Sequence, residues 1–159
     1  MKAEYFSTDI QEFAVLLNKY SVRYVIVGGE AVIYYGYVRV TGDIDIFYDS
    51  SPENAEKLYS SLKEFWQGEI PGIKDKEELA GQNIIIQFGR PPNRLDLLST
   101  IDSVTFDEAW DSKKTEKIVI ENREYHLYYI GLDKLIQNKS KVGRNKDLDD
   151  LKYLKALKA

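Results

Sequence analysis

The feature that most constrains this chain is the segment from Val25 to Tyr48, which reads VIVGGEAVIYYGYVRVTGDIDIFY. It begins with an apolar, β-branched run that ends at two glycines, which predicts a buried strand leading into a turn. A short helical segment follows, and the segment closes with two aspartates separated by one isoleucine. A glycine pair at the start of a helix, followed by an acidic strand, indicates a phosphate site that faces a metal site.

The acids of this segment are carried by a predicted strand. Side chains alternate between the two faces of a strand, so Asp43 and Asp45 point the same way while the isoleucines that follow them point into the core. The later run 94–98, RLDLL, obeys the same rule: its leucines face the core, and Arg94 and Asp96 share the other face. If the two strands are neighbours in the sheet, three carboxylates meet.

Such a cluster of carboxylates favours a bound cation. Two like charges about 4 Å apart repel by roughly 4 kcal/mol at an effective dielectric constant of about 20, so the three acids would raise one another's pKa. Magnesium prefers oxygen ligands and would neutralise them. A calcium-binding loop that starts at Asp43 is excluded, because its sixth position requires glycine and is Tyr48. The alternative is that the acids are solvated residues of a half-exposed strand.

The residues around the glycine pair suit a phosphate ligand. Gly28 and Gly29 permit close backbone approach and offer free amides at a helix start. They are not a P-loop, because no Gly-Lys-Ser/Thr follows them. We expect Arg39 to clamp phosphate and Thr41 to donate a hydrogen bond to it. The alternative is a tight turn whose arginine pairs with a surface acid.

The rest of the chain alternates predicted helices and strands. Helices are expected at 8–20, 30–37, 51–65, 105–111, 131–139 and 147–158, and strands at 24–27, 44–49, 83–88, 94–98, 117–120 and 125–130. Turn signals at 89–93 and 121–123 predict two hairpins. The pattern predicts an α/β (α+β) fold, with a mixed β-sheet flanked by helices and with helices at the C-terminus. We expect residues 1–159 to form one domain.

Composition limits the functional classes. There is no cysteine, which excludes disulfides, thiolate metal sites and a cysteine nucleophile. The formal net charge of −4 disfavours a broad nucleic-acid surface. No run of about 18 apolar residues occurs, and the N-terminal stretch lacks the uninterrupted apolar core of a signal peptide. We therefore expect a cytoplasmic protein that does not enter a membrane.

Taken together, these motifs resemble a known family. GGEA, then Gly36, then RVTGDIDIF resembles the signature of the polymerase-beta-like nucleotidyltransferase superfamily. The R-x-T-x-D-I-D spacing is closest to the AbiEii-type toxin nucleotidyltransferases and their bacterial relatives. Two further stretches, PPNRLDLLSTIDSVTFDEAW and NKSKVGRNKDLDDLKYL, are similar to those relatives as well.

The resemblance implies a nucleotidyltransferase fold and a reaction. A hydroxyl of a protein, RNA or small-molecule acceptor would attack the α-phosphate of a nucleoside triphosphate, and pyrophosphate would leave. Asp43 and Asp45 would bind two magnesium ions, and Asp96 would complete the metal site and help to deprotonate the acceptor. Gly28 and Gly29 would hold the triphosphate. A partner within a toxin–antitoxin pair is also implied.

The basic residues of the last helices complete the implied site: Lys139, Arg144 and Lys146 would approach the phosphates or the acceptor. From charge alone, a solvated helix face is about as good an explanation for these residues. Glu30 departs from the pattern, because it puts an anion at the start of a phosphate-binding helix. The alternative function is a non-catalytic module of the same fold that binds a nucleotide or a partner. A purely structural domain would leave the three acids apart in space.

Overall fold

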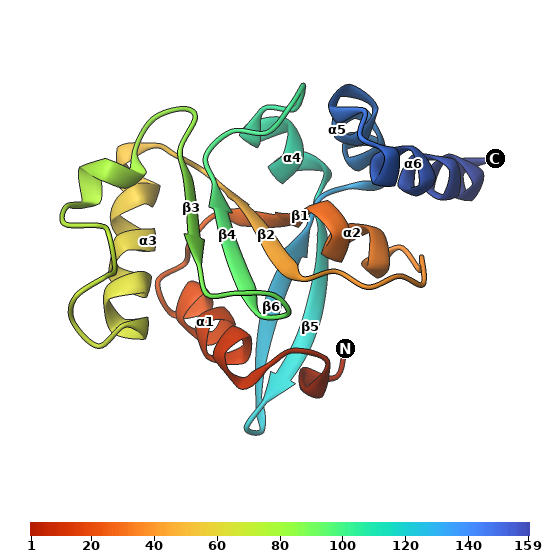
Figure 1. The fold of residues 1–159 in the computed structure, drawn as a ribbon. Coiled ribbons are helices and arrows are strands. Elements are labelled where there is room, and N and C mark those ends of the chain that lie inside the picture. The colour runs from red at the N-terminus through yellow and green to blue at the C-terminus, as the bar shows by residue number, and fades with distance from the viewer.

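The structure is a computed structural model that describes residues 1–159. It contains one six-stranded mixed sheet in the order β3-β4-β2-β1-β6-β5 (Figure 1). The strands are β1 (Tyr24–Val27), β2 (Asp43–Tyr48), β3 (Ile85–Phe88), β4 (Arg94–Leu98), β5 (Lys114–Ile120) and β6 (Arg123–Tyr129). The predicted α+β class with a mixed sheet is confirmed.

Helices flank the sheet and close the chain. They are α1 (Thr8–Lys19), α2 (Gly28–Tyr34), α3 (Pro52–Phe65), α4 (Phe106–Ser112), α5 (Leu132–Val142) and α6 (Asn145–Lys158), with short 3₁₀ turns η1 (Ala3–Tyr5) and η2 (Lys76–Leu79). Local sequence accounts for several starts: the Ser51 side chain caps α3 ahead of Pro52, and Thr105 forms a capping box at α4. None of these helices combines the length and the apolar character that a membrane span requires.

Pairing in the sheet mixes both directions. β2 runs antiparallel to β1 and parallel to β4, while β3 and β4 form one antiparallel pair and β5 and β6 another. The two predicted hairpins are therefore confirmed. In the second hairpin Glu121 and Asn122 both have positive φ, as a two-residue type I′ turn requires. β1 lies between β2 and β6, and all four of its residues are buried.

The two faces of the sheet are covered by different helices (Figure 1). Residues of α1 pack with Ile44 and Ile46 of β2, on the face that the alternation predicts to be the core. Phe47, on the opposite face with the acids, makes an edge-to-face contact with Phe106 of α4. The helices α2 and α4 contact the central strands, while α5 and α6 pack on each other at one end of the molecule.

Some predicted boundaries were wrong. The second helix begins at Gly28 rather than Glu30 and ends at Tyr34, because the glycine pair forms its first turn instead of a loop before it. β5 begins three residues earlier than the predicted 117, where pairing with β6 extends the strand. The third strand begins at Ile85 rather than Asn83, because Asn83 has a positive φ that a strand does not accommodate.

Candidate metal and phosphate site

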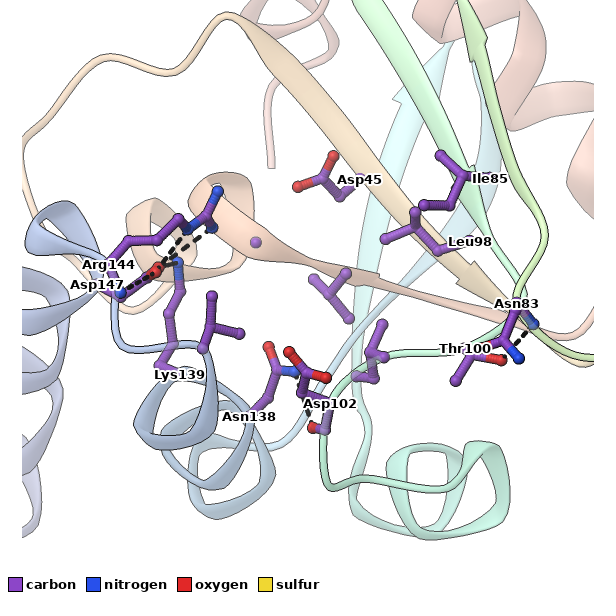
Figure 2. Close-up of a pocket in the computed structure, with 14 residues that line it drawn as sticks. Asp45, Asn83, Ile85, Leu98, Thr100, Asp102, Asn138, Lys139, Arg144 and Asp147 are labelled. Carbon is purple, nitrogen blue, oxygen red and sulfur yellow. Dashed lines mark hydrogen bonds and ion pairs between the residues drawn. The ribbon is translucent and has the colours of Figure 1, made fainter.

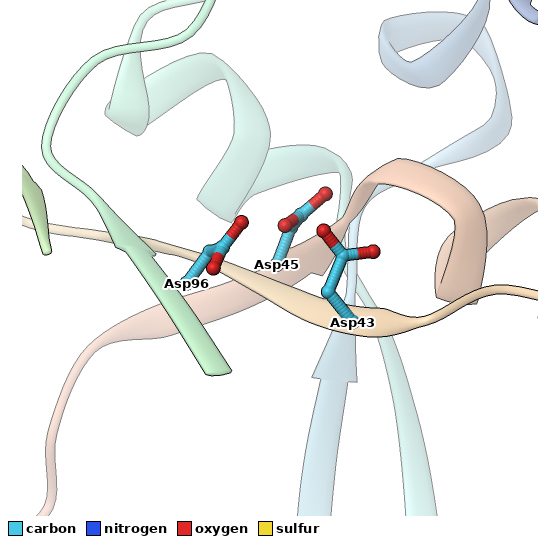
Figure 3. Close-up of side chains that lie close together, drawn as sticks. All are labelled: Asp43, Asp45 and Asp96. Carbon is cyan, nitrogen blue, oxygen red and sulfur yellow. The ribbon is translucent and has the colours of Figure 1, made fainter. Parts of the chain in front are cut away.

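The three predicted acids lie together on one face of the sheet. β2 and β4 pair in register, with Asp45 directly beside Asp96 and Asp43 beside Arg94. One carboxylate oxygen from each of the three aspartates lies within 4.8 Å of the others (Figure 3). Asp96 is buried, and the other two acids are partly exposed. The expectation attached to a purely structural domain, that the three acids lie apart in space, is therefore wrong.

The electrostatics of this cluster fit a hard divalent cation. Burial, followed by the charges of Asp43 and Asp96, raises the pKa of Asp45 to about 7. A cation bound among these oxygens would reverse that effect, because it stabilises the charged form of each carboxylate. Three aspartates with no nitrogen or sulfur ligand form the donor set that magnesium prefers. The residues present therefore fit such an ion.

Gly28 brings the backbone of α2 next to these acids. Its φ is +63°, and a Cβ placed on it would clash with the Asp45 carboxylate. Both the backbone conformation and the space therefore require glycine at this position. Gly29 is packed just as tightly against the loop that precedes β2: a Cβ there would lie 2.8 Å from the Arg39 guanidinium and 2.9 Å from the Thr41 hydroxyl.

Arg39 and Thr41 have partners within the protein. The Thr41 hydroxyl donates to the Asp43 carboxylate at 3.1 Å, and so orients one of the acids. Arg39 donates to Asp150 of α6 at 3.1 Å and thereby ties the loop before β2 to the C-terminal helix. Asp150 is buried, so this is not the pairing with a surface acid that the alternative predicted.

The basic residues of the C-terminal helices form a buried ion-pair network. Lys139 is only 3% exposed and donates to Asp147 and Asp150, each at 3.0 Å. Arg144 donates to Asp147 at 2.7 Å. Burial alone would raise the pKa of Asp147, but hydrogen bonds from Arg144 and Lys139 hold it below its usual range. With Arg39 included, three cations face two buried aspartates, so the network carries a net positive charge toward its surroundings.

Two predicted residues lie outside this arrangement. Lys146 is exposed in the first turn of α6 and does not line the cleft described below. Glu30 accepts a hydrogen bond from the Tyr5 hydroxyl at 3.1 Å and lines a separate cavity with Tyr34 and Tyr129. Burial raises the pKa of Glu30. Its carboxylate therefore faces the N-terminal segment and does not line that cleft.

A cleft of about 450 Å³ lies between Asp45 and the ion-pair network, and Asp45 is the one member of the three acids that lines it. One end is polar and charged, lined by Gly28, Asp45, Lys139, Arg144 and Asp147. Figure 2 shows Lys139 and Arg144 on the helix side of this end and Asp45 on the strand side. The other end extends over the exposed strand β3 and the end of β4, where the cleft is lined by Asn83, Ile85, Leu98, Thr100 and Asp102. Its volume lies within the range of small-molecule sites.

Sequence reasoning missed two parts of this site. The first is Arg94, which bridges two of the three acids. The strand pattern could have indicated this role, because it already placed Arg94 on the same face as Asp96. Nothing in the local pattern pointed to Asn138 and Asp102, which line the cleft and are joined by a hydrogen bond from the Asn138 amide to the Asp102 carbonyl at 3.0 Å. That contact joins α5 to a loop 36 residues away.

A comparison with models of known protein families gave a match over nearly the whole chain. A family model described as "Nucleotidyltransferase of unknown function (DUF6036)" matches residues 6–158. No curated protein matches the sequence.

Proposed function

The chain belongs to this family of nucleotidyltransferases, and from that premise we propose a magnesium-dependent enzyme that transfers a nucleoside monophosphate from a nucleoside triphosphate to a hydroxyl group. The acceptor would belong to a protein, an RNA or a small molecule. The observation that carries the proposal is the convergence of Asp43, Asp45 and Asp96 within 4.8 Å, beside a cleft that Asp45 lines on one side and Lys139, Arg144 and Asp147 line on the other.

The charges of the cleft support this assignment. A triphosphate needs positive charge along its length and close approach of the backbone, and the end formed by Gly28, Lys139 and Arg144 offers both. Lys139 and Arg144 already have aspartate partners, so their contribution to phosphate binding is the net positive potential of the network and not an isolated ammonium group. The end over Ile85 and Leu98 has the apolar surface that a nucleoside or an acceptor needs.

Each acid has a place in the reaction. Asp43, Asp45 and Asp96 would hold two magnesium ions, which when bound neutralise charge on the reacting phosphate. The acceptor oxygen forms a bond to the α-phosphorus, the bond to the bridging oxygen breaks, and pyrophosphate leaves. Asp96 would take the hydroxyl proton, and its burial between β2 and β3 would keep it oriented for that step.

The test is transfer of label from nucleoside triphosphates labelled at the α-phosphate. Full-length protein with magnesium would be offered cell-extract protein, total RNA and hydroxyl-bearing small molecules in separate reactions. Asp43→Asn and Asp45→Asn should abolish transfer, and Asp96→Asn should slow it by at least about a hundredfold, the usual range for a lost general base. Asp149→Asn is the matched control, because Asp149 is an exposed acid of α6 outside the cleft.

The remaining outcomes separate the alternatives. Binding of nucleotide without transfer to any acceptor, unchanged by Asp96→Asn, would indicate the non-catalytic binding module. Absence of both nucleotide binding and metal binding would refute the proposal.

Kinship to the AbiEii-type toxins, and with it a role in a toxin–antitoxin pair, stays a prediction from the resemblance. Co-purification of tagged protein from its natural host would test it. A stoichiometric partner whose co-expression relieves growth arrest by this chain is the supporting result, and growth unaffected by expression of the chain alone would count against a toxin.

A further inference from the structure

Arg94 is placed among the three acids by the register of the sheet. It stands beside Asp43 on the neighbouring strand and two residues before Asp96, so all three side chains share one face. The guanidinium Nη2 donates to Asp43 at 2.7 Å and to Asp96 at 3.0 Å, while Nε donates to the other oxygen of Asp96 at 3.0 Å. Arg94 thus joins two of the three carboxylates through one rigid group.

These contacts use the oxygens that a metal needs. Both oxygens of Asp96 accept from Arg94, and one of them also accepts from the Gln87 amide at 3.4 Å. One oxygen of Asp43 accepts from Arg94 and the other from Thr41. Asp45 is the acid that receives no hydrogen bond from Arg94.

We propose that Arg94 is a built-in competitor of the metal, whose guanidinium holds Asp43 and Asp96 and must leave before a divalent cation can bind both. The inference rests on the proposed metal-dependent function. A guanidinium and a divalent cation on the same oxygens would repel each other strongly, because their charges would lie only a few ångströms apart. The side chain is 31% exposed, so it has a route toward solvent.

This competition lowers the affinity of the site for a bare metal ion. It also prevents three carboxylates from facing one another without a positive charge, which favours the folded state. A purely structural Arg94 would have the opposite effect on metal binding: its removal would leave the carboxylates disordered and weaken the site. The direction of the change in metal affinity therefore distinguishes the two roles.

The experiment is a titration of full-length protein with Mn²⁺, with free Mn²⁺ measured by electron paramagnetic resonance in the absence of nucleotide. Arg94→Gln should lower the Kd for Mn²⁺ at least about tenfold, because the repelling charge is gone. Arg90→Gln is the matched control: it removes an exposed arginine from the turn before β4 that makes no ion pair, and should change the Kd less than about twofold.

Arg94→Lys keeps the charge but loses the planar fork, and should lower the Kd about threefold. It serves as the second variant if Arg94→Gln does not fold, which circular dichroism would reveal. A Kd that is unchanged or raised in the folded variants would overturn the inference.

The Mn²⁺ titration also distinguishes a wrong role for Arg94 from a wrong assignment of the acids as a metal site. If Arg94→Gln, from which the competing charge is gone, binds Mn²⁺ as weakly as the double variant Arg94→Gln/Asp45→Asn, the acids are not a metal site at all. If the unmodified protein binds Mn²⁺ and Asp45→Asn does not, the site stands and only the role of Arg94 is under test.

Discussion

Replacing Gly28 with alanine tests the tightest contact in the proposed site. Two separate costs are expected. The residue has a φ of +63°, and a left-handed conformation costs an L-residue about 1–2 kcal/mol. The added methyl group would also clash with the Asp45 carboxylate, and overpacking of this kind costs about 1–3 kcal/mol. Gly28→Ala should therefore lower the free energy of unfolding by about 2–5 kcal/mol.

Gly143 provides the control, because it isolates the first cost. Its φ is +71°, close to that of Gly28, but a Cβ there would meet nothing within 4 Å. Gly143→Ala should therefore cost only the conformational strain of about 1–2 kcal/mol. Urea unfolding followed by circular dichroism measures both values, and the difference between them reports the clash.

Rotation of the Asp45 side chain is one way to relieve the clash, and this rotation would change the affinity for metal. If the carboxylate rotates away from the new methyl group, stability is partly recovered but Asp45 leaves the acid cluster. Mn²⁺ affinity should then fall in Gly28→Ala and stay unchanged in Gly143→Ala. Equal stability loss in the two variants, together with unchanged Mn²⁺ affinity, would refute the close approach of α2 to the acids.

Two further predictions concern charged side chains. Lys139→Met removes the cation that two buried aspartates share, although Asp147 keeps Arg144 and Asp150 keeps Arg39, and should lower the free energy of unfolding by about 1.5–3 kcal/mol in urea. Lys141→Met, an exposed neighbour on the same helix, should change it by less than about 0.5 kcal/mol, and similar values for the two variants would contradict a buried network. The Lys134 ammonium, together with hydrogen bonds from Thr105, lowers the pKa of Glu108 from its ordinary 4.5 to about 2. Because the folded protein holds the charged carboxylate, this interaction stabilises the folded state fully above pH 4.5, and the stabilisation is lost as the pH falls toward 2. NMR titration of the Glu108 carboxyl in the unmodified protein should give a midpoint near pH 2, and Lys134→Gln should raise this midpoint. A midpoint near pH 4.5 in the unmodified protein would contradict the interaction.

Several features followed from the sequence because they depend on neighbours in the chain. The alternation of a strand places Asp43 and Asp45 on one face whatever the sheet around them. Ser51 and Pro52 mark the start of α3 because capping is a local interaction, and the same holds for Thr105 at α4. The start of α2 was misplaced because two glycines are typical of a turn, and Gly28 does have the positive φ of a turn residue although the helix is counted from it.

The tertiary structure decided how those local pieces combine. Asp96 joins the other acids only because β4 lies beside β2 in one register, and a shift by one residue would turn it into the core. Lys139 was expected to approach the phosphates or, from charge alone, to lie on a solvated helix face, but contact between α5 and α6 surrounds it with Asp147 and Asp150 and buries all three. Arg94 was visible in the sequence as a residue on the acidic face, while its bridge between two acids needed the coordinates of both strands. Backbone geometry determines which way a side chain points, but which side chains then meet depends on the packing that buries the most apolar surface, and that is a property of the whole chain.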